Sequence, residues 1–229
     1  MIQLQTYLDE QLLASCAFCG GETGTRDHCP SRVLLDEPYP ENLPVVPACS
    51  RCNVRFSGDE EYLACLISCV IAGSSDPSAM PREKTRRILA DKPALRARIE
   101  RSCFESNNGV MFKPEHERVS AIITKLAQGH ALYELHEPCA RPPDAVIFQP
   151  LALMSKTERH KFESPEPADF WPEVGSRAMQ RLVVGGDTVH GQWIQVQPER
   201  YRFHASPANG VEIRIVIHEY LAGSVRWDY

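Results

Sequence analysis

The sequence lacks any hydrophobic run that approaches the about 18–20 residues needed to cross a membrane as a helix. Its first residues, MIQLQTYLDEQLLA, lack the basic segment of a secretory signal and carry Asp9 and Glu10 instead. Internal repeats and low-complexity segments are also missing. These absences argue against a membrane protein, an exported protein and a repeat array. We therefore expect a globular cytoplasmic protein with no membrane partner.

Positive charge is scarce outside one short segment. The chain carries a net charge of -5, and residues 1–80 hold four Lys and Arg against eleven Asp and Glu. Residues 81–103 reverse this balance, with eight Lys and Arg against three Asp and Glu. If the protein acts on nucleic acid, we expect this basic segment or a partner chain to hold the phosphates, because the acidic region would repel them.

Cysteine is plentiful, with nine residues in the chain. A disulfide framework is not expected, because such frameworks belong to small secreted domains. Four cysteines form two CxxC pairs. The other five lie in apolar or helical context and are expected to be buried as small apolar side chains; they are Cys29, Cys65, Cys69, Cys103 and Cys139.

Hydrophobic periodicity predicts helices in the first two thirds of the chain. Ser57 followed by Glu60 has the pattern of a capping box, with helical spacing up to Gly73. Residues 81–104 suggest two helical pieces broken near Pro93, with Asp91 as the N-cap of the second. Residues 115–134 have the clearest helical period, and Ser155 begins a short polar helix.

From about residue 179 the pattern changes to the alternation typical of strands. The segments RLVV, WIQVQ, YRFHAS and VEIRIVIHEYL are predicted strands of an antiparallel sheet. The chain is thus expected to be α+β, with room for one large domain or two modest ones. We divide it into a module at 1–75 that contains both CxxC pairs, a helical segment with a basic face at 76–137, and a β-rich region of unassigned role at 138–229.

The motif that carries chemistry lies between Cys16 and Asn53. Two CxxC pairs are set apart by an Asp27-His28-Cys29-Pro30 step, and an asparagine follows the last cysteine. Four thiolates at this spacing are typical of a closed tetrahedral zinc site. The zinc ligands would be Cys16, Cys19, Cys49 and Cys52.

The remaining polar residues of this region suit hydrolysis of a phosphodiester. That reaction needs a base for the attacking water and positive charge on the phosphate oxygens. His28 offers the base, because histidine titrates near neutral pH. Asp27 and Asn53 offer the hard oxygen atoms that Mg²⁺ prefers. Asn53 has a simpler interpretation as a helix-capping residue.

These residues, in this order, resemble the zinc-containing branch of the HNH endonuclease superfamily, over roughly residues 14–70. The resemblance implies a treble-clef-like ββα-metal fold in which zinc is structural and Mg²⁺ or Mn²⁺ is catalytic. It makes His28 the general base, and Asp27 and Asn53 the catalytic metal ligands. Asn42 would be the middle asparagine that orders the loop, although an asparagine there is also a common turn residue.

Two positions depart from the family pattern. Phe56 stands where members often carry a lysine, and Cys29 follows the catalytic histidine where an apolar residue is usual. The basic residue expected near Phe56 is therefore in doubt.

Two groups of arginines are candidate nucleic-acid contacts, with ordinary ion pairing and a solvated helix face as the alternatives. The first group lies in the acidic module, and the second in the basic segment. They are Arg26, Arg32, Arg51 and Arg55, and then Arg96, Arg98 and Arg101.

The sequence therefore predicts an endonuclease that acts on nucleic acid, with DNA more expected than RNA. Small HNH proteins resembling this one occur in phage-defence and mobile-element settings, which suggests an effector role. Two alternatives stay open. The chain could be an inactive zinc module that binds nucleic acid or protein, or a subunit that needs a protein partner or a second copy of itself to act.

Overall fold

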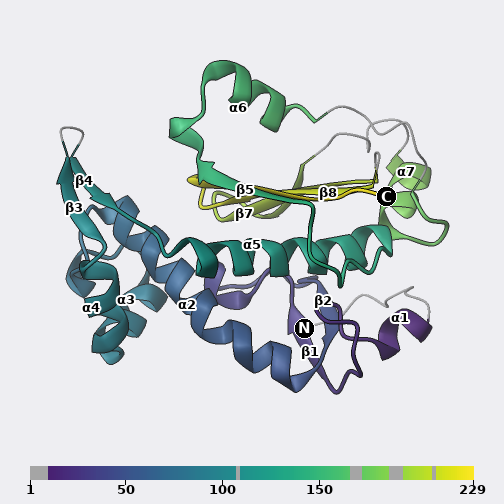
Figure 1. Cartoon of the computed structure of the whole chain (residues 1–229), viewed down its shortest axis with the longest axis horizontal. Helices are drawn as coiled ribbons and strands as arrows, with labels where there is room; N and C mark the ends of the chain where they lie inside the picture. The colour runs from purple at the N-terminus through teal and green to yellow at the C-terminus, as the bar shows by residue number, and fades with distance from the viewer. Residues whose placement is uncertain (1–9, 107–108, 166–171, 186–192, 208–209) are drawn as a thin grey trace.

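The computed structural model describes residues 10–106, 109–165, 172–185, 193–207 and 210–229. The architecture is α+β, as the sequence predicts (Figure 1). A long central helix, α5, separates an N-terminal hairpin-and-helix unit from a C-terminal antiparallel sheet (Figure 1). In the described part of the chain, no helix combines the length and apolar character needed to span a membrane.

The N-terminal unit is a β-hairpin followed by a long helix. Strands β1 and β2 pair antiparallel, with Thr25 opposite Ala48 and His28 opposite Val45. Its elements are α1 (Glu10–Ala14), β1 (Thr25–His28), the 3-10 turn η1 (Arg32–Leu34), β2 (Val45–Ala48) and α2 (Ser50–Ala72). The α2 helix ends at Gly73, which adopts a left-handed conformation with φ 62° that glycine tolerates without strain.

The predicted start of this helix at Ser57 is wrong. The helix begins seven residues earlier, at Ser50, and Ser57 lies inside it with its hydroxyl donating to the Val54 carbonyl. The N-cap is Cys49, whose sulfur accepts the Cys52 N–H. A cysteine sulfur thus caps the helix, which a pattern restricted to Ser, Thr, Asp and Asn does not detect.

The middle of the chain is a helical pair and a hairpin. Its elements are η2 (Pro77–Ala79), α3 (Glu83–Asp91), α4 (Pro93–Glu100), β3 (Cys103–Ser106) and β4 (Gly109–Phe112). The break near Pro93 is confirmed, but Asp91 is the last residue of α3, and Lys92 takes the N-cap position of α4. The hairpin projects from the body (Figure 1), and Cys103 is exposed on it, contrary to the expected burial.

Helix α5 (His116–His130) continues through a π-helical turn, η3 (Ala131–Leu135). It contacts α2 on one side and strands β5, β8 and β9 on the other. Close approach is possible because glycines lie at two crossings. A Cβ on Gly129 would come 2.6 Å from the Cys29 sulfur, and one on Gly223 would come 3.0 Å from Ile123.

The C-terminal sheet has the strand order β5-β9-β8-β7-β6 and is antiparallel throughout. Its strands are β5 (Ala145–Pro150), β6 (Ile194–Gln197), β7 (Tyr201–Ser206), β8 (Val211–Ile217) and β9 (Leu221–Trp227), accompanied by η4 (Leu151–Leu153), α6 (Lys156–Glu163) and α7 (Arg177–Gly185). Ser155 caps α6 with a full capping box, as predicted. The strand predicted at 181–184 is instead part of α7. The strand predicted over 211–221 ends at Ile217, and neither β5 nor β9 was predicted.

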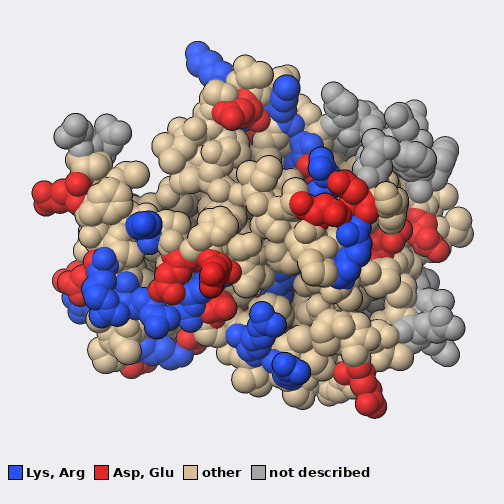
Figure 2. Space-filling model, viewed as in Figure 1, with Lys and Arg blue, Asp and Glu red and all other residues tan. Residues whose placement is uncertain are grey.

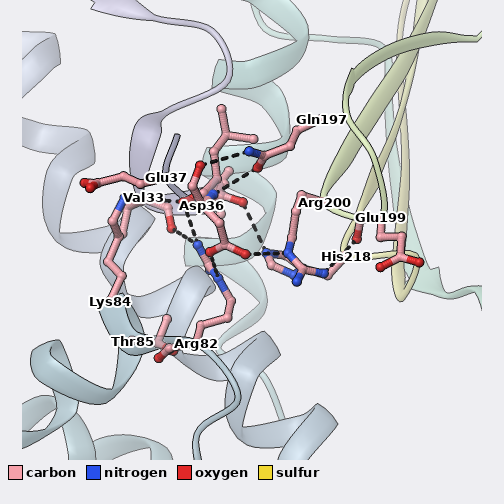
Figure 3. A network of polar contacts seen from close by, with 12 residues as sticks. Val33, Asp36, Glu37, Arg82, Lys84, Thr85, Gln197, Glu199, Arg200 and His218 are labelled. Carbon is pink, nitrogen blue, oxygen red and sulfur yellow. Dashed lines mark hydrogen bonds and ion pairs between the residues drawn. The ribbon is translucent and has the colours of Figure 1, made fainter. Parts of the chain in front are cut away.

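One hydrophobic cluster extends from Cys16 to Trp227, so the three expected segments share a core. A polar network also joins them (Figure 3). Asp36, in the loop after η1, accepts from Arg82 at 2.7 Å and from Arg200 at 2.5 Å. Burial alone would raise the pKa of Asp36, but the two arginines outweigh burial and lower it. This carboxylate therefore ties the N-terminal unit to both the basic segment and the sheet.

Candidate metal centre and active site

Four cysteine side chains converge where the N-terminal knuckle meets the start of α2. The sulfur atoms of Cys16, Cys19, Cys49 and Cys52 all lie within 4.8 Å of one another. The Cys19 and Cys49 sulfurs are 3.8 Å apart. A tetrahedral site with Zn–S bonds of about 2.3 Å has edges of about 3.8 Å. The cluster could therefore hold a zinc ion, as its spacing predicts.

A backbone contact and burial change the pKa values of the cysteine thiols in this cluster. The Cys52 N–H donates to the Cys49 sulfur at 3.4 Å, and this contact is the main reason that the pKa of Cys49 is lowered to about 7. Burial raises the pKa of Cys16 and of Cys52. Buried thiols of this kind become ligands when a cation compensates their thiolate charge, which is the chemistry of a structural zinc site.

Asp27 lies at the other end of the hairpin and contacts a buried lysine. Its Oδ2 is 2.7 Å from Nζ of Lys125, a residue of α5 whose side chain is only 2% exposed. Glu60 of α2 also pairs with Lys125, and Ser31 Oγ accepts from the ammonium group at 3.1 Å. Burial alone would lower the pKa of Lys125, but Glu60 and Asp27 outweigh it and raise the pKa. Lys125 is therefore a cation between two carboxylates.

The sequence analysis missed this cluster. Lys125 lies among the apolar residues of α5, next to Leu126 and one turn after Ile122. A lysine on the buried stripe of a helix is a signal in itself, because lysine is almost never fully buried without a partner. The identity of the partners could not be read from the sequence, because Asp27 and Glu60 meet it only through folding.

The ion pair with Lys125 uses only one of the two carboxylate oxygens of Asp27. Its Oδ2 atom is buried, yet the side chain as a whole is 12% exposed, so the exposure belongs to its other atoms. One carboxylate oxygen is held by Lys125, which orients the group and leaves Oδ1 as the candidate ligand for a cation.

His28 follows Asp27 at the end of β1, where successive side chains point to opposite faces. Burial lowers the pKa of His28, and the positive charge of Arg32 lowers it further, with Asp27 opposing both. The imidazole is therefore neutral at neutral pH. Within the described residues its ring has no hydrogen-bond partner, so it is able to accept a proton from a water molecule.

Asn53 lies in the first turn of α2, beside β1. Its Nδ2 donates to the Arg26 carbonyl at 3.3 Å and lies 3.5 Å from Thr25 Oγ1. These contacts fix the amide against the strand that carries Asp27 and His28. Because the amide nitrogen faces the strand, its oxygen is the atom left to bind a ligand.

Asp27 and Asn53 each carry an oxygen donor of the kind that binds hard cations. A carboxylate and an amide oxygen are ligands of the type that Mg²⁺ accepts, with water and substrate oxygens filling the other positions. The positive charge of Lys125 disfavours binding of a cation to Asp27, and the negative charge of Glu60 reduces this repulsion. Among the residues that the structure describes, only the four cysteines form a metal-binding group of three or more His, Cys, Asp or Glu side chains.

Asn42 is exposed in the turn before β2, and its side chain forms no hydrogen bond within the described structure. Its proposed role in ordering the loop stays a prediction. Four of the arginines are exposed on the N-terminal unit, in β1, η1 and the first turns of α2; they are Arg26, Arg32, Arg51 and Arg55. In the basic segment, Arg96 is half-buried in α4, and Arg98 and Arg101 are exposed.

Comparison with models of known protein families finds no match to the chain. Comparisons with curated proteins and with solved structures likewise find none.

Proposed function

We propose that the chain is a metal-dependent endonuclease of the HNH type, which hydrolyses phosphodiester bonds of nucleic acid, DNA before RNA. What supports this proposal is that β1 carries a histidine with a lowered pKa and a carboxylate oriented by Lys125, and that the Asn53 amide contacts the same strand. The hairpin β1–β2 followed by α2 has the order of a ββα-metal module, and the cysteine cluster would hold its structural zinc.

Each residue then has a distinct task. His28 accepts the proton of the attacking water through its neutral ring. Asp27 and Asn53 hold Mg²⁺ or Mn²⁺, which when bound supplies positive charge to the phosphate oxygens. Lys125 holds Asp27 in one orientation, and the zinc cluster fixes the start of α2 and therefore Asn53. Arg32, whose charge lowers the pKa of His28, is the candidate we propose to contact the scissile phosphate.

The test is cleavage of supercoiled and linear DNA with Mg²⁺ or Mn²⁺ by the full chain. We expect His28→Ala to abolish cleavage while zinc content and circular dichroism stay unchanged. The matched control is His160→Ala, on the exposed face of α6, which should cleave like the parent. Equal cleavage by the His28→Ala chain would contradict the assignment.

One observation favours a second candidate, an inactive zinc module that binds nucleic acid or protein. Asp27 and Asn53 both have contacts that a purely structural role would explain, namely the Lys125 ion pair and the bonds to β1. This candidate predicts zinc in the purified chain and no cleavage by the parent protein with either metal. An effector that waits for a partner or a second copy would instead gain activity when that chain is added.

A further inference from the structure

A groove lies between the end of α4 and the β3–β4 hairpin, away from the zinc cluster and β1. It is shallow and open to solvent, with a volume of about 510 Å³, within the range of about 300–1,000 Å³ that holds small ligands. Its lining is Arg98, Arg101, Ser102, Cys103, Phe104, Lys113, Pro114 and Glu115. Both arginines of this lining were predicted from the sequence as nucleic-acid contacts, whereas Phe104 and Lys113 were not.

The groove has an excess of positive charge. Arg98 and Glu115 face each other at 3.6 Å and largely offset one another. Arg101 and Lys113 are exposed, and neither forms an ion pair with another described residue. Lys and Arg side chains gather over α3 and α4, at the lower left of Figure 2, with acidic side chains interspersed. The two uncompensated cations of the groove therefore suit an anionic ligand.

An aromatic side chain lies beside these cations. Phe104 is 49% exposed, although phenylalanine is usually buried. In the hairpin register Phe104 is opposite Met111, and the ladder continues with the Lys113 N–H donating to the Ser102 carbonyl. Alternation along the strands then puts Phe104 and Lys113 on the same face of the hairpin. The exposed ring of Phe104 and the side chain of Lys113 therefore line the same wall of the groove.

We propose that this groove binds a single strand of nucleic acid, with phosphates on Arg101 and Lys113 and an unpaired base stacked on Phe104. The choice of a nucleic-acid ligand rests on the proposed nuclease function. Stacking on an exposed aromatic ring beside a basic track is how proteins hold single strands without reading their sequence. The bases of a duplex are already stacked inside the helix, so they are not free to stack on Phe104. The groove would therefore select substrates that contain unpaired nucleotides.

The test measures binding in the His28→Ala full chain, so that no probe is cut. Fluorescence anisotropy is recorded with a short labelled oligothymidine, its oligouridine counterpart and a DNA duplex of equal length, over a range of salt. We expect a single strand to bind more tightly than the duplex. The two single-stranded probes decide between DNA and RNA as the source of the strand.

Substitutions then assign the contacts. Phe104→Ala and Phe104→Leu should each weaken single-strand binding about tenfold, since stacking contributes about 1–3 kcal/mol per base, and Phe104→Trp should restore or strengthen it. Arg101→Ala with Lys113→Ala should reduce the slope of log K against log salt by about 1.4, or about 0.7 for each lost phosphate contact. Arg159→Ala, which removes an exposed charge on α6, is the matched control.

Three results would overturn the proposal. Unchanged single-strand affinity in the Phe104 variants would remove the stacking contact. Equal binding of the duplex, with the same dependence on Arg101 and Lys113, would make the groove a duplex contact. Absence of single-strand binding would leave the exposed ring to a protein partner. Cleavage by the parent chain is scored separately, so failure of the groove and failure of the nuclease assignment are distinguishable.

Discussion

Lys125 Nζ and Asp27 Oδ2 lie 2.7 Å apart, which joins the central helix α5 directly to strand β1 of the N-terminal unit. Glu60 closes the cluster from α2. The rings of Phe18 and Phe56 lie 5.4 Å and 5.6 Å from the ammonium group, so little water reaches it. Each charge in this cluster depends on the others, because a buried ion without its partner is strongly unfavourable.

We predict that Lys125→Met lowers the free energy of unfolding by about 3–5 kcal/mol, because Asp27 and Glu60 are left as two largely buried carboxylates without a cation. Urea denaturation measures the loss. Lys161→Met, at an exposed position of α6, is the control and should change stability by less than about 0.5 kcal/mol. Adding Asp27→Asn and Glu60→Gln to Lys125→Met should recover much of the loss, and no recovery would mean that the ion cluster is not its cause.

The cysteine cluster gives a second prediction. The purified chain should contain about one zinc ion per molecule, measured by mass spectrometry of metals, because four sulfur ligands complete a structural site. Cys52→Ser should lose the metal and the fixed structure of β1, β2 and α2, seen as loss of the near-ultraviolet circular dichroism. Cys103→Ser, at the exposed cysteine of the hairpin, should keep both. A zinc-loaded Cys52→Ser chain would contradict the proposed ligand set.

Local patterns in the sequence predicted much of this architecture. The spacing of the two CxxC pairs predicted the cysteine cluster, and the helical period of 115–134 predicted α5. Strand alternation predicted β6, β7 and β8, and Ser155 correctly indicated the start of α6. In each case the signal lies within a few residues, where geometry alone connects the side chains.

Signals that depend on distant contacts were missed or misinterpreted. Residues 181–184 have a strand-like composition but belong to α7, where Arg181 pairs at 3.0 Å with the buried carboxylate of Glu134. Lys125 went unremarked because its partners come from β1 and α2. Tertiary contacts override local preference in such segments, and one sequence does not reveal which contacts form.

Two glycines in helices should respond to alanine with opposite signs. Gly129→Ala places a Cβ 2.6 Å from the Cys29 sulfur, so we expect a loss of about 1–3 kcal/mol from overpacking. Gly58, inside α2, has open space around its Cβ position, so Gly58→Ala should gain up to about 1 kcal/mol from helix propensity. Thermal unfolding compares the two. Cys29→Ala combined with Gly129→Ala should recover part of the loss, because it removes the sulfur and leaves the position-29 Cβ 3.1 Å away. Equal effects at both glycines would refute the packing argument.

The last prediction concerns acid stability and the network that joins the sheet to η1 (Figure 3). His218 is 9% exposed, and its Nε2–H donates to the Leu34 carbonyl at 3.1 Å. Burial lowers the pKa of His218 to about 4, the charges of Arg82 and Arg200 act in the same direction, and Asp36 opposes them. The folded chain therefore keeps this histidine neutral at a pH where the unfolded chain protonates it.

The unfolded state takes up this proton below about pH 6.5, whereas the folded state does so only near pH 4. Stability should therefore fall as the pH drops from about 6.5 to about 4, with His218 contributing up to about 3 kcal/mol of that loss. His130, whose pKa burial lowers to about 3, adds a loss in the same direction.

Because Asn tolerates the left-handed backbone at position 218, where φ is 55°, His218→Asn removes the titration with little strain. The free energy of unfolding, measured by urea denaturation at several pH values, should fall less steeply with acid for His218→Asn than for the parent. His160→Asn, on the exposed face of α6, should show the same fall as the parent. A parent and a His218→Asn chain with the same pH slope would exclude His218 as a source of the acid sensitivity.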